Sequence, residues 1–460
     1  MTEQQKMKFS DSITTKKMIF YTLGGISNGL LFTMWGQIQY FAVTILLIPT
    51  AVIPLIYLIY SIIDGVNDPI IGYLADKSNK FTSRFGKRFP WIIGGLIIGP
   101  IFLILSFIQI SPSILISVIW LIIVMTVNDT FMSSREINEM ALFPDLFRED
   151  SHRRKVIVIG AIIGGIATIF INVLIPRFIS SIGYLGTVVL VVIFGYILAI
   201  PYSSGIREPK EMKEFRAELD SSQRGSSPMG EVIKRVFKDR CWMGITIAGF
   251  SWSVAGACFL YGLNFYVQHS LGLDIGATAL PLLMVNSVGF LLAPLWTWIS
   301  RKIGVRNAYL AGMFFNIITY FSLMFVTDLI SLTLVFALAG VGFSATAGVI
   351  FGLLRAQGID NATVNSGKRE EGSYSGIYKI FTAFSYFFQT IIFAIVAIFT
   401  GYDPILATGN SEAAKFGLLF QMSIIPMIIT IIGTITFFFL YKISKEEAID
   451  IKFKIEEMNL

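Results

Sequence analysis

The stretch GYLGTVVLVVIFGYILAIPYSS, residues 183–204, decides the fold class, because it is long, mostly apolar and free of charged side chains. A helix needs about 20 consecutive apolar residues to cross the hydrocarbon core of a bilayer. A strand of a transmembrane barrel would instead alternate apolar and polar residues. Residues 183–204 therefore predict a membrane-spanning α-helix.

Segments of the same kind lie on both sides of this stretch and predict an all-α membrane protein with twelve transmembrane helices. The composition agrees, since hydrophobic residues make up 54% of the 460 residues and charged residues only 14%, against about 25% charged in soluble domains. The mean hydropathy is +0.71. The predicted spans lie near residues 18–41, 44–71, 91–110, 114–142, 156–176, 183–204, 241–267, 277–300, 307–327, 330–354, 372–400 and 416–441.

The basic residues predict the orientation of these spans. Arg177 and Lys415 fall in predicted outer loops, whereas nearly all other Lys and Arg residues fall in the tails and in the loops of the opposite side. Cytoplasmic loops carry such an excess of positive charge. We therefore expect a multi-pass protein of the inner (cytoplasmic) membrane with both termini in the cytoplasm. The net charge of +6 is explained in this way without nucleic-acid binding.

A polar segment divides the chain into two halves. Residues 205–240 mix both charges with Ser, Gly and Pro, which is typical of a linker. Secondary transporters are commonly built from two such repeats. The sequence thus predicts an N-terminal six-helix bundle at 1–204, a cytoplasmic linker at 205–240, a C-terminal six-helix bundle at 241–441 and a cytoplasmic tail at 442–460.

Carboxylates at the end of the second predicted span indicate an ion site. Asp64 and Asp68 are four residues apart and share a helix face, with Asn67 beside them. A carboxylate in hydrocarbon is costly and is usually paired or functional. These oxygen ligands suit a monovalent cation or a proton. The alternative is a solvated helix end at which Asp68 merely precedes Pro69.

The same region carries a family resemblance. DGVNDPIIG at residues 64–72 and RFGKRFPW at residues 84–91 resemble the signature of the glycoside–pentoside–hexuronide:cation symporters, which include the melibiose permeases and belong to the major facilitator superfamily. The resemblance implies the major facilitator fold and a cation site at Asp64, Asn67 and Asp68. It also implies a gating cytoplasmic loop, with candidate residues Gly72, Asp76, Arg84, Arg88 and Arg369.

The resemblance extends to span 4. Ser133 matches a hydroxyl residue of the family's cation site, and Glu136 occupies the position of a sugar-binding aspartate. The alternative is an early end of the span that leaves Arg135, Glu136 and Glu139 in water. Two departures point to a different solute: Asn28 stands in place of a span-1 aspartate, and Ala161 in place of a span-5 arginine.

Further candidates for solute binding lie in spans 1 and 11. Trp35 offers a ring that can stack on a sugar, although such residues more often belong to an interfacial aromatic belt. Tyr378 and Lys379 lie on span 11, one helical turn before the family's functional lysine. We hypothesise that the Lys379 ammonium points at Asp64 and Asp68 and partly replaces a bound cation. The alternative is a lysine that snorkels to the cytoplasmic end.

Taken together, these residues predict a secondary active transporter that moves a sugar or glycoside by cation-coupled symport and alternating access. The coupling ion is H⁺ or Na⁺, with no cofactor and no metal beyond a possible Na⁺. The sequence shows no nucleotide-binding or catalytic motif, so we expect no enzyme activity. A lysolipid or another amphipathic solute, or a non-transporting sensor, remain as alternatives. We expect a monomer.

Overall fold

The computed structural model describes residues 13–77, 85–147, 150–209, 229–367, 371–406 and 409–457, and within these ranges the regular elements are helices without a strand. Each of the twelve predicted segments contains a helix, although residues 45–52 and 106–110 within two of them are not helical. Among the described residues, nine helices are long and apolar enough to cross a membrane, and Phe89–Leu105 is a shorter apolar helix. The fold class is confirmed, while the number of separate crossings stays a prediction.

The chain forms two compact units, one of residues 1–48 and 59–225 and the other of residues 49–58 and 226–460. The division falls inside the predicted linker 205–240. Residues 210–228 of that linker lie outside the described part of the chain, so the domain boundaries stay a prediction. Each unit is described by itself below.

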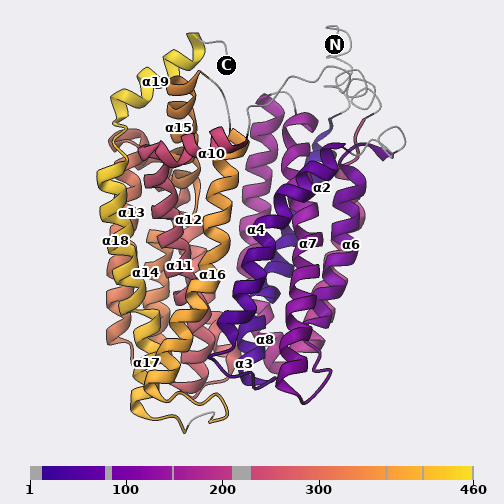
Figure 1. Cartoon of the computed structure of the whole chain (residues 1–460), viewed down its shortest axis with the longest axis vertical. Helices are drawn as coiled ribbons and strands as arrows, with labels where there is room; N and C mark the ends of the chain where they lie inside the picture. The colour runs from indigo at the N-terminus through magenta and orange to yellow at the C-terminus, as the bar shows by residue number, and fades with distance from the viewer. Residues whose placement is uncertain are drawn as a thin grey trace. The chain divides into compact units, whose positions relative to one another are not determined.

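Unit 1 is a bundle of long helices joined by short turns (Figure 1). Helix α8 merges predicted spans 5 and 6, because the expected loop at 177–182 is helical up to a sharp turn at Gly183, whose φ is 74°. A positive φ costs glycine little. The helices of this unit are α2 (Thr15–Trp35), α3 (Ile38–Thr44), α4 (Ile53–Lys77, shared with the second unit at its start), α6 (Phe89–Leu105), α7 (Ile114–Leu146) and α8 (Asp150–Gly205).

Unit 2 contains a second bundle, in which each of four predicted spans is divided between two helices, at 277–300, 307–327, 330–354 and 416–441. Figure 1 shows α10 running across the long helices of this unit and α19 following the end of α18. The helices are α10 (Met229–Lys238), α11 (Arg240–His269), η1 (Ile275–Thr278), α12 (Ala279–Ile303), α13 (Val305–Ser322), η2 (Leu323–Phe325), α14 (Leu329–Thr346), α15 (Val349–Ser366), α16 (Glu371–Thr400), α17 (Glu412–Met422), α18 (Ile424–Leu440) and α19 (Lys445–Glu457).

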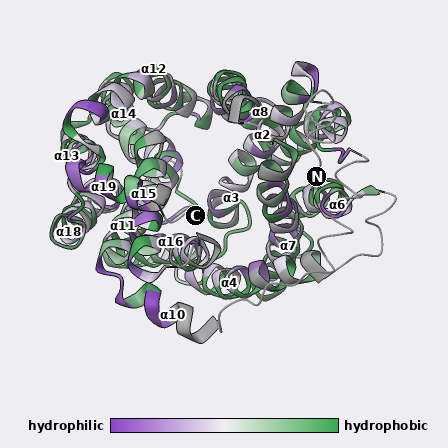
Figure 2. Cartoon of the chain, turned by 90° about the horizontal axis from the view of Figure 1, so that it is seen from above, coloured by the Kyte–Doolittle hydropathy of each residue, from purple (hydrophilic) through white to green (hydrophobic). Residues whose placement is uncertain are grey.

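Small residues let neighbouring helices approach closely, as in other membrane bundles. A Cβ on Gly95 of α6 would collide with the carbonyl of Phe131 on α7, and one on Gly340 of α14 would lie 2.7 Å from the carbonyl of Val285 on α12. Large apolar side chains remain on the outside of both units, among them Ile200 at 73% and Phe399 at 87% exposed. Figure 2 shows the corresponding hydrophobic colour on the long helices and a hydrophilic stretch on α10.

Candidate functional site

The predicted acidic site lies where α4 packs against α7 in unit 1. The Asp64 side chain is buried, and its carboxyl group makes a side-chain hydrogen bond with that of Asp129 on α7. The Tyr60 hydroxyl donates to Asp129 Oδ1 at 2.9 Å. A hydrogen bond between two carboxyl groups requires one proton between them, because an ionised carboxylate only accepts. This pair is therefore a natural place to hold a proton or to exchange it for a cation.

The other two predicted cation ligands border the same pair. Asp68 lies within electrostatic range of Asp129, and Asn67 Nδ2 donates to Thr130 Oγ1 on α7 at 3.0 Å. The structure thus brings Asp64, Asn67 and Asp68 to one side of α7. Among the described residues, no group of three His, Cys, Asp or Glu side chains is spaced to hold a metal ion. A bound Na⁺ would need neutral oxygens as well.

A neutral oxygen of this kind lies one turn earlier on α7. Thr126 Oγ1 is buried and has no hydrogen-bond partner in the described part of the chain. Residues three and four apart share a helix face, so Thr126 lies on the side of α7 that carries Asp129 and Thr130. An unsatisfied buried hydroxyl is costly, and a bound cation or water would satisfy it.

Ser133 and Glu136 follow Asp129 along α7. Ser133 is buried one helical turn beyond Asp129. Glu136 lies two turns beyond it and is exposed. Their roles in binding stay predictions. Asp129 is absent from the residues predicted from the sequence, although its position in the middle of an apolar span was an available signal.

Arg135 is buried, contrary to the alternative of a solvated helix end. Its Nη2 donates to the carbonyl oxygen of Gly24 on α2 at 2.5 Å, and its Nε lies 3.7 Å from Glu139 Oε2. Its guanidinium also lies 5.5 Å from the centre of the Tyr202 ring of α8. A buried charge needs such partners. Arg135 therefore ties α2, α7 and α8 together on a side of α7 other than that of Asp129.

Trp35 and Asn28 both belong to α2. Trp35 is buried and its ring lies 5.6 Å from that of Tyr60, whose hydroxyl binds Asp129. Trp35 is thus connected to the acidic pair through Tyr60. Asn28 is half-buried two turns earlier.

Arg88 and Gly72 are predicted loop residues that lie in the described part of the chain. Arg88 Nη1 donates to Asn138 Oδ1 at 3.2 Å, and its backbone N–H donates to Glu208 Oε1 at 2.8 Å. A Cβ on Gly72 would lie 4.0 Å from the nearest atom, on Ile137 of α7. The side chain of Asp76 and the predicted loop residues Arg84 and Arg369 lie outside the described part of the chain.

Tyr378 and Lys379 lie on α16 of unit 2. The Tyr378 ring stacks under the guanidinium of Arg355 at 4.8 Å, and Arg355 Nη2 donates to Ser375 Oγ at 3.1 Å. Lys379 is half-buried. Because Asp64 and Asp68 belong to unit 1, the hypothesis that Lys379 faces them stays a prediction. Arg355, within α15, is a cation in an apolar helical stretch and is absent from the residues predicted from the sequence.

Residues 21–445 match the family described as MFS/sugar transport protein. A lactose permease of Leuconostoc lactis is 21% identical over 414 residues, which cover 85% of this chain and 62% of the permease. An isoprimeverose transporter of Lactiplantibacillus pentosus is 22% identical over 404 residues, 85% of this chain and 80% of the transporter. An uncharacterized symporter of Synechocystis sp. is 34% identical over 89 residues, 19% of this chain and 13% of that protein.

Solved transporter structures share the fold. The nucleoside transporter NupG superposes with a TM-score of 0.63 at 14% identity, over 93% of this chain and 100% of that chain. The inward-open xylose transporter XylE from E. coli gives 0.61 at 13% identity, over 95% and 98%. At such identity the likeness shows the fold alone.

Proposed function

Since the chain belongs to the family of MFS/sugar transport proteins, we propose that it moves a sugar or glycoside across the cytoplasmic membrane in symport with H⁺ or Na⁺. As a member of that family it is a multi-pass membrane transporter and not an enzyme. The predicted relation to the glycoside–pentoside–hexuronide:cation symporters is confirmed by the family match and by the sugar transporters and symporters among its relatives.

The observation that carries the proposal is the Asp64–Asp129 carboxyl pair between α4 and α7, with Asp68 in electrostatic range. Two acids in hydrogen-bond contact inside an apolar bundle repel each other when both are ionised. A proton or a monovalent cation relieves this repulsion, with Asn67, Thr130 and Thr126 supplying neutral oxygens. The pair is therefore proposed as the coupling site.

Coupling requires the ion to favour the state that binds solute. In alternating access the two halves expose a midplane site to each side in turn. The ring of Trp35 packs on Tyr60, which holds Asp129. Protonation of the carboxyl pair, or binding of a cation to it, would thus act through Tyr60 on the Trp35 ring, which can stack on a sugar. We expect Trp35, Asn28 and Glu136 of unit 1 to contact the solute. Tyr378 and Lys379 are the expected contacts from unit 2.

The relatives favour a glycoside as the solute class, since one is a lactose permease and another an isoprimeverose transporter. No cofactor beyond the ion is proposed. We expect the protein to work as a monomer with both termini in the cytoplasm.

Uptake into proteoliposomes tests the proposal. The wild type is assayed with glycosides, pentoses, uronates and lysolipids, under an imposed H⁺ or Na⁺ gradient. Gradient-driven accumulation of a sugar or glycoside is expected. Flux of lysolipid alone, or no flux of any solute, would contradict it.

The coupling site is tested in the same vesicles with Asp68→Cys. This variant is expected to lose gradient-driven accumulation, because one carboxylate of the site is removed. Glu446→Cys, at an exposed acid of α19, is the matched control and should accumulate solute normally. Unchanged accumulation by Asp68→Cys would refute the assignment.

A further inference from the structure

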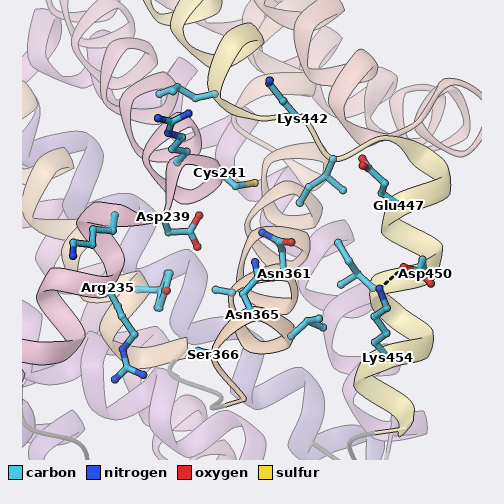
Figure 3. Close-up of a pocket in the computed structure, with 18 of the residues that line it drawn as sticks. Arg235, Asp239, Cys241, Asn361, Asn365, Ser366, Lys442, Glu447, Asp450 and Lys454 are labelled. Atoms are coloured by element: carbon cyan, nitrogen blue, oxygen red, sulfur yellow. Dashed lines mark ion pairs between the residues drawn. The ribbon is translucent and has the colours of Figure 1, made fainter.

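A separate cavity of about 950 Å³ lies entirely within unit 2, at the end where α18 leaves its apolar span. Its walls come from α10, the start of α11, the end of α15, the segment after α18, and α19. Figure 3 shows Asn361 and Asn365 of α15 in the middle, with Asp239 on one side and the Asp450–Lys454 ion pair on the other. Cavities of this size hold small molecules.

The wall between α18 and α19 is fixed by hydrogen bonds. The Tyr441 hydroxyl donates to Gln357 Oε1 of α15 at 3.0 Å, and Arg306 Nε of α13 donates to the Tyr441 carbonyl oxygen at 2.7 Å. The segment between α18 and α19 is therefore anchored to α13 and α15. Helix α10 is anchored separately, since its Val236 is fully buried in the same core as Tyr441.

The three acids that line the cavity already have partners. Asp239 Oδ1 accepts the backbone N–H of Trp242 and caps α11. Glu447 Oε2 accepts the backbone N–H of Ser444, while the Glu447 N–H donates to Ser444 Oγ, as in a capping box. Asp450 Oδ2 lies 2.7 Å from Lys454 Nζ. Two of these carboxylates thus cap helix ends and the third pairs with Lys454, although all three keep their negative charge.

Three cations of the same wall have no such partner. Within the described part of the chain, Lys238, Arg240 and Lys442 line the cavity but make no hydrogen bond or ion pair. They come from α10, α11 and the segment after α18. Together with Arg235 and Lys454 they give the lining five cations against three acids, so chain segments far apart in the sequence converge on one region of net positive charge. Charged side chains of one sign lining a concavity concentrate counter-ions.

The cavity also offers neutral polar and apolar surface. Asn361 and Asn365 lie four residues apart on one face of α15 and supply amide donors and acceptors. Leu440, Ile443 and Ile451 supply apolar contacts. This combination suits an organic anion rather than a bare ion. Basic pockets among transmembrane helices at a membrane surface recognise phosphorylated head groups.

From this arrangement we propose that the cavity binds a phosphate-bearing organic anion through Lys238, Arg240 and Lys442. The ligand is either the head group of an acidic phospholipid or a free phosphorylated metabolite. A bound anion would bridge α10, which belongs to the predicted linker between the halves, to the segment that leads into α19. This site lies apart from the carboxyl pair of unit 1 and does not depend on the proposed transport activity.

Binding to the purified full-length protein in detergent tests the site, with two matched pairs of probes. Dioctanoylphosphatidylglycerol is compared with zwitterionic dioctanoylphosphatidylcholine, and adenosine monophosphate with uncharged adenosine. Lys238→Gln/Lys442→Gln removes two cations from the cavity. Arg301→Gln/Lys452→Gln removes the same charge from exposed positions of unit 2 that do not line it.

We expect the acidic member of at least one pair to bind the wild type more tightly than its control. The cavity variant should weaken the Kd by about tenfold or more, because charge-assisted contacts are lost, while the control variant should not. Binding of the phosphatidylglycerol alone assigns a lipid head group, and binding of the nucleotide alone assigns a free metabolite. Failure of both acidic probes to bind, or equal weakening in both variants, overturns the proposal. If the double variant does not fold, each single substitution is measured against the same controls.

Discussion

At the scale of single residues, the position of an acidic residue along the axis of α7 decides which side chains it contacts. Asp129 and Glu136 are seven residues apart, so they lie on nearly the same side of the helix but about 10 Å apart along its axis. Only Asp129 is level with Asp64 and accepts from Tyr60. Periodicity gives the face of a helix but not the depth of its partner. Glu136 was selected from the family resemblance as a solute-binding residue, and that role stays a prediction.

We predict that Asp129→Asn abolishes accumulation of solute against a gradient. The amide keeps the size of the side chain but can neither share a proton as a carboxyl pair does nor neutralise a cation. Glu446→Gln, at an exposed acid of α19, is the control and should retain accumulation. Uptake into proteoliposomes under an imposed ion gradient measures both variants. Unchanged accumulation by Asp129→Asn, or equal loss in both variants, would contradict this role of Asp129.

Glu208 is a second residue whose role emerges only from its contacts. It is buried, and its carboxylate accepts the backbone N–H of Arg88 at the start of α6. Gly86 lets this happen, because its φ is 100° and a Cβ there would lie 2.6 Å from the Glu208 carboxyl carbon. Negative charge at a helix N-terminus is stabilising.

Gly86→Ala is therefore expected to lower the melting temperature of the purified protein. The left-handed conformation alone costs an L-residue about 1–2 kcal/mol, and the contact with Glu208 adds to it. Gly94→Ala serves as the control, since a Cβ on that helical glycine meets nothing within 4 Å. Equal melting temperatures for the two variants would contradict this role of Gly86.

At the scale of elements, polar caps and glycine turns set where the apolar helices stop. The helix α14 begins after Asp328, whose carboxylate accepts the Ser331 N–H at 2.8 Å in a capping box. Hydrogen bonds from Ser331 lower the pKa of Asp328. A lowered folded-state pKa means that the stabilisation is present above the unfolded-state value and is lost as the pH falls through the folded-state value.

The cap gives a pH-dependent prediction. Asp328→Ala should lower the melting temperature at pH 7, and the difference from the wild type should shrink as the pH falls below about 4. Glu446→Ala changes an exposed acid of α19. Its difference in melting temperature from the wild type should not shrink as the pH falls. Thermal unfolding of the purified protein at several pH values measures both. A difference for Asp328→Ala that is constant with pH would rule out the ionised cap.

At the scale of the whole molecule, the apolar exterior and the membership of a transporter family describe a membrane carrier. Hydrocarbon accommodates side chains such as Phe399 that would be costly in water. In alternating access, transport depends on the movement of one half of the carrier against the other. The hypothesis about Lys379 concerns both units, because it pairs this cation of unit 2 with Asp64 and Asp68 of unit 1.

If Lys379 partly replaces a bound cation, uptake should proceed with a proton gradient and without sodium. A fixed ammonium near the acids would disfavour a second positive charge. Uptake measured with and without a sodium gradient tests this. Strict sodium dependence would count against it, and sodium dependence that appears only in Lys379→Ala would support it.

The apolar helices, the transporter family and the acids of α4 follow from the amino-acid sequence, because hydropathy and short motifs are local properties of the chain. The folded chain is needed to see that Asp129 meets Asp64, that Glu208 caps α6, that Arg135 is buried, and that α10, α15 and α19 enclose a basic cavity. Each of these pairings depends on the relative depth and rotation of packed helices. Those quantities are set by the packing of all their side chains together, and no single segment contains them.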